Sequence, residues 1–377
     1  MSRARDIADL SSVSARLDTL GGSSGSFGVG RNVLINSEMK VAQRATSKTG
    51  LTNFNNGYHT LDRFKFEESG SPSYQFTMSQ STTAPDGFGY SLKMDCTTAQ
   101  GSLGAGDTLA IQQRIEGQNL QQFQKGTSTA KQWTMSFYVR GTTTGTYICQ
   151  LFDNDNNRFV SKSYTIDTAN TWERKTITFP ADTTGALNNS NGASLLVIWY
   201  LAAGSNFTSG TLQTDWGGNT AANKAVGQVN LASSTSNDWY MTGCQLELGD
   251  TATDFEHEPY ETTLRKCQRY LSILLRDDEN DDQNIGSVYS ATRCFIKVFH
   301  KVTMRAVPTI SLVGTIGANL YNNGSSVSAT GINASYPKTD STGLDFTPSS
   351  SLSGGTAFHL DWTQTSSSHY VKAEAEL

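Results

Sequence analysis

The sequence predicts an all-β protein made of a β-sandwich and a second, smaller β-sandwich, with a short N-terminal helix and one connecting helix. Composition is the first reason. Glycine, serine, threonine and asparagine are abundant, proline is scarce, and aromatic residues make up 10% of the chain, which favours strands and turns. The second reason is the alternation of apolar and polar residues over long stretches. The third is that helical spacing of apolar residues occurs only near the N-terminus and near residue 260.

An attachment segment is expected at residues 1–30. Its apolar side chains follow heptad-like spacing at Ile7, Leu10, Val13, Leu17 and Leu20. Such a seam is typical of a helix that packs against other helices. Two heptads are too short to be stable alone, because helix nucleation is costly. We therefore expect trimerisation or docking on a partner, with a frayed tail as the alternative, and then a flexible glycine–serine linker up to Gly30.

The first sandwich is expected to span residues 31–258. Strands are predicted at residues 132–140, 146–152, 159–166, 171–180 and 195–201. In the first of these, every second residue is large and apolar, so half of that strand should lie in the core. Residues 153–157, Asp-Asn-Asp-Asn-Asn, form a natural hairpin loop. The continuous apolar run at 195–201 suits a strand that is buried on both faces.

A long polar stretch at residues 203–237 interrupts this series of strands. A segment of this kind inside a β-domain is usually an exposed functional loop. Trp216 is the isolated aromatic residue in it. Flat aromatic rings cover the apolar face of a sugar, while amides and carboxylates bind its hydroxyl groups. The candidate glycan-binding residues are Trp216, Trp239, Tyr321, Asp215 and Asn219. Core packing is the competing explanation for both tryptophans.

The stretch from Trp239 to Tyr270 joins a strand to a helix. Its strand part predicts a core face made of Tyr240, Thr242, Cys244, Leu246 and Leu248. Pro259 suits the first turn of a helix, and apolar residues then recur at Tyr260, Leu264, Cys267 and Leu271. This stripe would suit a threefold axis, and packing beneath the sandwich is equally compatible. We expect a connecting helix at residues 259–276 and a C-terminal β domain at 277–377.

Three sequence blocks carry a resemblance to a known family. Residues 32–46 read Asn-Val-Leu-Ile-Asn-Ser-Glu-Met-Lys-Val-Ala-Gln-Arg-Ala-Thr, residues 58–64 contain Asp62-Arg63, and the third block runs from Gln245 to Tyr270. The blocks resemble virion proteins that tailed phages encode, marine phages especially. The departures are Ser37 and Ala45 in place of usual glycines, and His257 and Glu258 where the family is more often basic.

The resemblance implies a phage structural protein with a jelly roll like that of carbohydrate-binding modules, usually placed in tail fibres or tail appendages. The expected partners are further copies in a homotrimer, other tail or virion proteins through the N-terminus, and a host surface polysaccharide. The protein would be synthesised in the host cytoplasm and would act on the virion tail in host-cell attachment. A purely structural head or tail protein that binds other virion proteins is the alternative.

Charge and hydropathy exclude several classes of function. The net charge is −5. Five neighbouring acidic residues account for all of it, so the rest of the chain is balanced: Asp277, Asp278, Glu279, Asp281 and Asp282. The rest of the chain has no basic field that would attract nucleic acid. No apolar run of about 18 residues is present to insert in a membrane. Five cysteines are widely spaced without a C-x-x-C pair, so we expect buried free thiols.

The sequence contains no catalytic motif, and we expect neither an enzyme nor a cofactor. The five histidines are dispersed, without H-E-x-x-H spacing. A polysaccharide depolymerase is the least favoured alternative. Its paired carboxylates would meet only in the fold, so the sequence does not exclude it, but phage depolymerases commonly use long parallel β-helices, and no repeat of that kind is present. Asp153, Asp155 and Asn157 copy the start of a calcium loop, but Arg158 stands where glycine is required, which favours a turn. Jelly-roll modules of this kind often hold a structural calcium, so the resemblance leaves one ion with unassigned ligands open.

Overall fold

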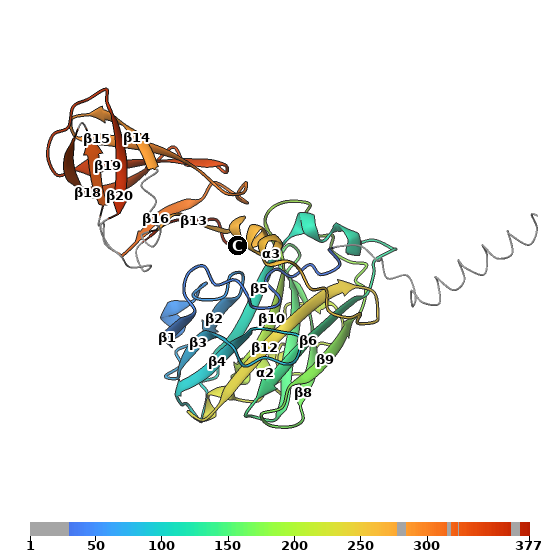
Figure 1. Ribbon diagram of the computed structural model, residues 1–377. Helices are drawn as coiled ribbons and strands as arrows, with labels where there is room; N and C mark the ends of the chain where they lie inside the picture. Colours follow the sequence, from blue (N-terminus) through green and yellow to red (C-terminus); the bar gives the residue numbers. More distant parts are fainter. Residues whose placement is uncertain (1–29, 277–283, 315–317, 323, 363–369) are drawn as a thin grey trace, which may run out of the picture. The chain divides into compact units, whose positions relative to one another are not determined.

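The computed structural model describes residues 30–276, 284–314, 318–322, 324–362 and 370–377 (Figure 1). Contacts divide the chain into two units, Met1–Glu258 and Pro259–Leu377. The expected N-terminal helix, with Ile7, Leu10, Val13, Leu17 and Leu20, lies outside the described residues, and so does the acidic run.

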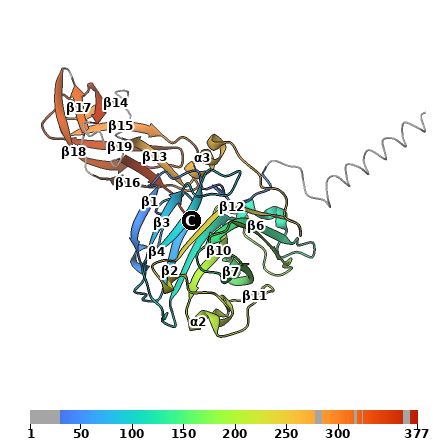
Figure 2. The same cartoon turned by 60° about the horizontal axis from the view of Figure 1, so that its bottom comes forward.

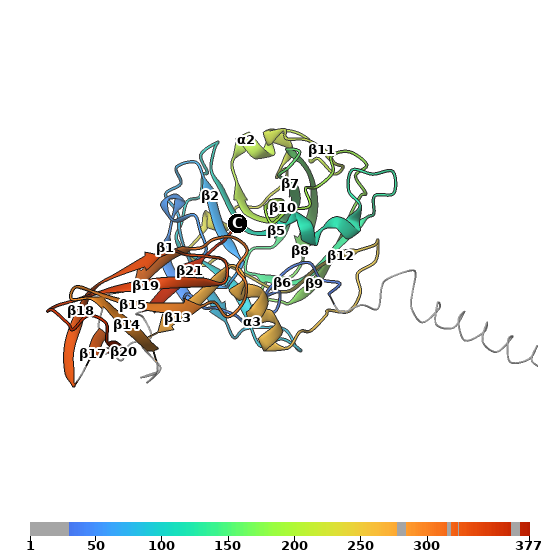
Figure 3. The ribbon, with the colours of Figure 1, turned by 90° about the horizontal axis from the view of Figure 1, so that it is seen from above.

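The first unit is a sandwich of two six-stranded antiparallel sheets (Figures 1 and 3). One sheet has the order β1 (Ser47–Leu51), β3 (Gln75–Ser81), β4 (Ser91–Thr98), β12 (Asp238–Leu248), β6 (Trp133–Gly141) and β9 (Glu173–Phe179). The other has the order β11 (Gly217–Gly218), β8 (Arg158–Ile166), β7 (Gly145–Asp153), β10 (Ala193–Ala203), β5 (Thr108–Glu116) and β2 (Lys65–Ser69). Phe137 of β6 and Trp199 of β10 meet edge to face in the core, with ring centres 6.3 Å apart. The all-β class and the sandwich are as predicted.

The outer face of β10 is covered, as its apolar sequence predicts. The segment after β10, which includes α2 (Ser205–Thr208), returns over this face (Figure 2). Tyr200 packs there with Ile148 and Ala225, and Phe207 and Leu212 contact the same cluster. Part of the 203–237 stretch is therefore packed against the sheet, and the expectation of an exposed loop is wrong for this part, because its few apolar residues bury themselves there.

A β-bulge in β12 makes the predicted core face wrong before Gly243 and right for Cys244 and Leu246 after it. The register with β6 shifts between Thr242 and Gln245, and Gly243 has a φ of +61°, which glycine adopts without strain. Before the bulge Trp239 and Met241 point into the core, and after it Cys244 and Leu246 do. Trp239 is 0% exposed, so its prediction as a glycan-binding residue is wrong.

The three sequence blocks, the third of them as far as Glu258, meet in the first unit and are joined by hydrogen bonds. Asn32 donates from Nδ2 to the carbonyl of Cys244 at 2.9 Å, and its Oδ1 accepts from the N–H of Leu246 at 3.1 Å. Glu256 accepts from the N–H of Asn32 at 3.2 Å. Asp62 of the second block accepts from the N–H of Gln43 at 3.0 Å. These block residues therefore stabilise the fold.

The second unit is all-β apart from one helix, α3 (Tyr260–Gln268). Three of its strands form a sheet in the order β13 (Leu271–Arg276), β21 (Tyr370–Glu374) and β16 (Thr309–Val313). Six others close into a barrel: β14 (Asn284–Ser290), β15 (Arg293–Phe299), β19 (Ser341–Pro348), β18 (Ser325–Ser335), β17 (Ala318–Asn322) and β20 (Ala357–Trp362). The expected second sandwich is a barrel because β20 pairs with both β14 and β17.

All five cysteines are free and buried, as predicted. Burial raises the pKa of the Cys294 thiol to about 11, and burial with the nearby Asp95 charge raises that of Cys96 to about 11. Thiols with such pKa values are poorly reactive at neutral pH. Among the described residues, no helix has the length and apolarity needed to cross a membrane.

Candidate functional site

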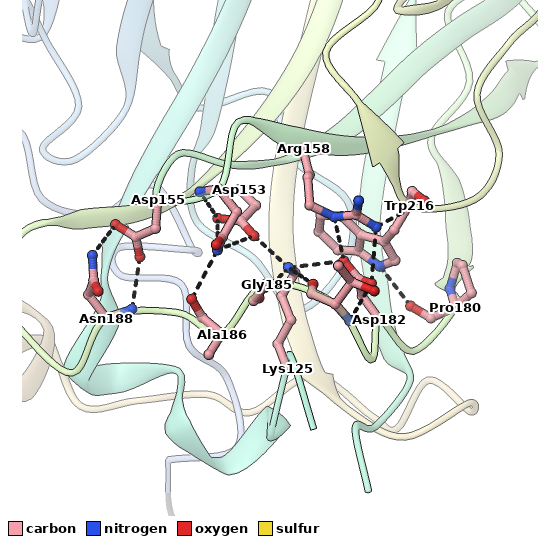
Figure 4. A network of polar contacts seen from close by, with 12 residues as sticks. Lys125, Asp153, Asp155, Arg158, Pro180, Asp182, Gly185, Ala186, Asn188 and Trp216 are labelled. Carbon is pink, nitrogen blue, oxygen red and sulfur yellow. Dashed lines mark hydrogen bonds and ion pairs between the residues drawn. The ribbon is translucent and has the colours of Figure 1, made fainter. Parts of the chain in front are cut away.

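Four segments at one end of the sandwich bring charged side chains and a tryptophan together (Figure 4). They are the turn between β7 and β8, the loop after β9, the segment before β11, and the segment between β5 and β6 that carries Lys125. Gly217 pairs with Phe159, which holds the segment before β11 beside the start of β8. We call the group the Trp216 cluster. It consists of Lys125, Asp153, Arg158, Asp182 and Trp216.

The ammonium group of Lys125 lies at the centre of the Trp216 cluster. It forms ion pairs with Asp153 and Asp182, and it donates to the carbonyl oxygens of Thr184 and Gly185 at 3.1 and 2.8 Å. The Lys125 side chain is only 1% exposed. A buried ammonium ion is tolerated only where other oxygen atoms replace its water shell, and the surrounding loops supply them here.

Local packing directs Lys125 to this position. Phe123 stacks on Trp133 with ring centres 3.8 Å apart, which fixes the chain just before the lysine. Gly126 follows with a φ of +82°, and a Cβ atom there would overlap the backbone of Ala186. Glycine is therefore required for the two loops to approach each other.

Arg158 makes the second link in the Trp216 cluster. Its Nε and Nη2 atoms each donate to the Asp182 carboxylate at 3.2 Å, and Nη2 also donates to the carbonyl of Trp216 at 3.2 Å. Burial by itself would raise the pKa of Asp182, but hydrogen bonds from Arg158 and Lys125 bring it below its ordinary value. Asp182 is therefore ionised at neutral pH, and it holds both cations in place.

The carboxylates of the hairpin turn also bind protein donors. Asp153 accepts from the N–H of Asn156 at 3.0 Å. Asp155 accepts from the main-chain and side-chain amides of Asn188 at 2.9 and 2.8 Å. Of the side chains that copy the start of a calcium loop, Asp155 thus ties the turn to the loop after β9, and Asp153 stabilises the turn itself, in agreement with the predicted turn.

Trp216 is half-buried, and its position is set by polar contacts on several sides. The indole N–H donates to the carbonyl of Pro180 at 2.9 Å. The Lys125 ammonium lies 4.8 Å from the ring centre, and the Trp133 ring lies 6.3 Å away. A cation over an aromatic face is attracted by the ring electrons. The ring is therefore held rigidly while part of the residue remains open to solvent.

Asp215 and Asn219 are exposed, and they lie one and three residues from Trp216 in the chain. Asn219 donates from Nδ2 to the side-chain oxygen of Asn157 at 2.8 Å. Asn157 has a φ of +52° at the hairpin. The surface thus offers one aromatic ring, one carboxylate and several amides, which is the set that a sugar ring needs.

Tyr321 lies in the second unit, apart from this cluster in the chain. It pairs in register with His359 across β17 and β20, and the two rings stack with centres 4.7 Å apart and planes within 3°. Both residues are half-buried. Ile285 pairs with His359 on its other side and is 72% exposed. These three side chains form a row on the outside of the barrel, in which the Tyr321 and His359 rings lie flat against each other.

The residues predicted for oligomerisation on the connecting helix do not form one helical stripe. Tyr260 is 51% exposed, Leu264 is half-buried and Cys267 is buried. Leu271 belongs to β13, because α3 ends at Gln268. Its assignment to the helix is therefore wrong.

Sequence analysis missed Lys125 and Asp182 as members of the site. Lysine is usually exposed, and its two carboxylate partners lie far from it along the chain. No local pattern around Lys125 marks it as buried. Arg158 was noted only as the residue that disqualifies a calcium loop, whereas the structure gives it a direct bond to the Trp216 backbone.

No family model matches the chain, and no curated protein matches it. Solved structures are similar to it at low levels. The enzymatically active domain of bacteriophage CBA120 tailspike protein 4 matches with 12% identity and a TM-score of 0.30, over 58% of this chain and 21% of the tailspike chain.

Carbohydrate-binding modules are also among the similar structures. The family 11 module from Clostridium thermocellum, solved with a β-1,3-1,4-mixed-linked tetrasaccharide, has 10% identity and a TM-score of 0.27, over 56% of this chain and 99% of its own. The CBM22-1-CBM22-2 tandem domain of Paenibacillus barcinonensis Xyn10C has 11% identity and a TM-score of 0.29, over 94% of this chain and 100% of its own. TM-scores this low do not establish a common fold, so function is inferred below from the residues themselves.

Proposed function

We propose that the protein is a tail fibre or tail appendage protein of a tailed phage, and that it attaches the virion to its host by binding a surface polysaccharide. The resemblance of the three sequence blocks supports the virion role. The Trp216 cluster supports the glycan-binding role. Synthesis in the host cytoplasm, assembly as a homotrimer and anchoring to other virion proteins through the N-terminus belong to the same proposal.

The observation that carries the proposal is Trp216, whose ring is fixed by its contacts while part of the residue remains exposed. The indole is bonded to Pro180 and lies against the Lys125 ammonium, so it loses little conformational freedom when a ligand stacks on it. The apolar face of a sugar ring can cover the exposed part of the tryptophan. Asp215 and Asn219, which are exposed and close to it in the chain, can then bind hydroxyl groups.

The direct test is binding of the full chain to purified envelope polysaccharide from the phage host, measured by calorimetry. Saturable binding that free polysaccharide also blocks on whole cells is the expected result. Absence of saturable binding to any fraction of the host envelope would refute the glycan-binding role.

A purely structural protein of the head or tail is the second candidate. Three large apolar side chains on β14 and β15 favour it: Ile285 is 72% exposed, Tyr289 73% and Phe299 69%. Exposed apolar groups of this size suit contact with another protein. This role predicts that the chain binds purified virion proteins but that polysaccharide does not compete with its attachment to cells.

We further propose that the protein binds polysaccharide without cleaving it. In the Trp216 cluster, Asp153 and Asp182 form ion pairs with Lys125, and in the neighbouring hairpin turn Asp155 accepts a hydrogen bond from Asn188. These carboxylates serve as structural anchors, whereas a glycosidase needs two that face the substrate. Release of reducing ends from the host polysaccharide during a long incubation would overturn this part of the proposal.

A further inference from the structure

A second group of acidic residues lies at the end of β2, away from the residues used above. Glu68 lies two residues after the buried Phe66, so both side chains point to the same face of β2, and Glu68 is 3% exposed. Asn56 fixes its backbone by donating to the carbonyl of Glu68 at 2.8 Å and accepting from its N–H at 2.7 Å. No described residue donates a hydrogen bond to either carboxylate oxygen of Glu68. A buried carboxylate in this condition is strongly destabilised.

Asp107 lies beside Glu68 because β2 pairs with the start of β5. Ser69 is opposite Thr108 in the register, and Glu68 is opposite Leu109. Asp107 is 4% exposed. A Cβ atom on Gly70 would overlap the Asp107 carboxylate, so glycine at this position lets the end of β2 approach it.

Backbone groups hold the Asp107 carboxylate in a fixed orientation. It accepts from the N–H groups of Ser71 and Gly104 at 3.1 and 2.7 Å, and from Nε2 of Gln100 at 3.0 Å. Among the described residues, no lysine or arginine forms an ion pair with Asp107 or Glu68. Two buried carboxylates therefore lie together without a cation from the protein.

The electrostatics of this group agree with the geometry. Burial, together with the Asp107 charge, raises the pKa of Glu68 to about 8. Burial also raises the pKa of Tyr74, with contributions from Glu68 and Asp107. The Tyr74 hydroxyl donates to the carbonyl of Thr108 at 3.0 Å, so its proton does not neutralise Glu68. The pair carries one negative charge when Glu68 is protonated and two when it is ionised. No lysine or arginine among the described residues forms an ion pair that offsets this charge.

We propose that Glu68 and Asp107 form a binding site for a divalent cation that prefers oxygen ligands. Two carboxylates balance a charge of +2, and hard cations such as Ca²⁺ and Mg²⁺ take carboxylate oxygens with backbone carbonyls and water. The residues described around the site offer oxygen atoms as metal ligands. Zn²⁺ is less suited to it, because Zn²⁺ prefers histidine and cysteine ligands. The ion would join the end of β2 to the turn before β5. This inference does not depend on glycan binding.

The test uses the full chain, freed of metal with a chelator and then dialysed at pH 7.5. Titration with CaCl₂, and separately with MgCl₂, is followed by calorimetry and by thermal unfolding. We expect one saturable site with a dissociation constant of roughly 1 mM or tighter, and a melting temperature that rises with cation concentration. Glu68→Gln and Asp107→Asn should each weaken binding about tenfold or more.

Glu67→Gln is the matched control, because Glu67 neighbours Glu68 but pairs with Lys65 on the other face. It should bind the cation like the unchanged protein. If Glu68→Gln fails to fold, Asp107→Asn and the cation-dependent melting temperature of the unchanged chain still decide the question. No binding up to about 10 mM of either cation, or equal binding by Glu68→Gln, would overturn the proposal and leave Glu68 as a protonated core residue.

Discussion

The ammonium of Lys125 lies 4.8 Å from the centre of the Trp216 ring and is bonded at the same time to the Asp153 and Asp182 carboxylates. One buried charge therefore fixes the hairpin turn, the loop after β9 and the aromatic ring. A ligand that stacks on this ring meets a surface whose conformation is already set.

Replacing Trp216 with alanine should weaken polysaccharide binding about tenfold to a hundredfold, because buried aromatic anchors dominate such surfaces. Isothermal calorimetry with the host polysaccharide measures the loss. Trp172→Ala is the control, since Trp172 is also half-buried but precedes β9, whereas Pro180 and Trp216 lie at its other end. Equal losses in both variants would contradict a specific role for Trp216.

Lys125→Met should lower the free energy of unfolding of the first unit by about 3–5 kcal/mol, because it leaves Asp153 and Asp182 buried without their shared cation. Five of the six tryptophans lie in this unit, so urea unfolding followed by tryptophan fluorescence reports on it. Lys131→Met, at an exposed position, should change stability little. A Lys125→Met protein as stable as this control would show that the ammonium is not needed.

Without a bound cation, stability should depend on pH through Glu68. Its pKa rises from an ordinary value of 4.5 to about 8 in the folded protein, so the folded state binds the proton more tightly than the unfolded state. The resulting stabilisation is full below pH 4.5 and is lost as the pH rises through 8. Melting temperatures measured in chelator across this range should fall, and Glu68→Gln should flatten the curve. Parallel curves for the two proteins would rule out Glu68 as the titrating group.

Tyr321→Ala tests whether the second unit adds to glycan binding. If the flat row with His359 and Ile285 binds sugar, this change should weaken binding, and its effect should add to that of Trp216→Ala within about 0.5 kcal/mol, as expected for independent sites. Tyr289→Ala removes another tyrosine of the barrel that is 73% exposed, and it should leave binding unchanged. An unchanged affinity for Tyr321→Ala would limit glycan binding to the first unit.

The proposed homotrimer predicts a particle mass three times that of the chain in light scattering at micromolar concentration. Removal of residues 1–30 should reduce the mass to that of a monomer, because the heptad seam lies there. A monomeric full-length chain would refute the trimer while leaving the virion role open to test.

The fold could be predicted where the periodicity of the sequence is local and regular. The alternation at residues 132–140 correctly predicted β6, and the Asp-Asn turn correctly predicted the hairpin of β7 and β8. Prediction failed for the part of β12 before Gly243, because one extra residue there reverses the faces between the two halves of the strand and leaves no mark in the alternation. The burial of Trp239 follows from that single bulge.

The candidate site could be predicted only in part. Trp216 stands alone in a polar stretch, which is a visible signal. Its support by Lys125 and Asp182 depends on four segments that meet only in the folded chain. The acidic pair of Glu68 and Asp107 arises in the same way, from the register between β2 and β5.

The closed ring of β14, β15, β19, β18, β17 and β20 gives each of its strands a partner on both sides. Open strand edges can pair with other chains and start aggregation, and this hazard grows with local concentration. Many copies of this barrel can therefore be crowded together without joining edge to edge. Contacts that the barrel makes with its neighbours would therefore be made by side chains and not by shared sheets.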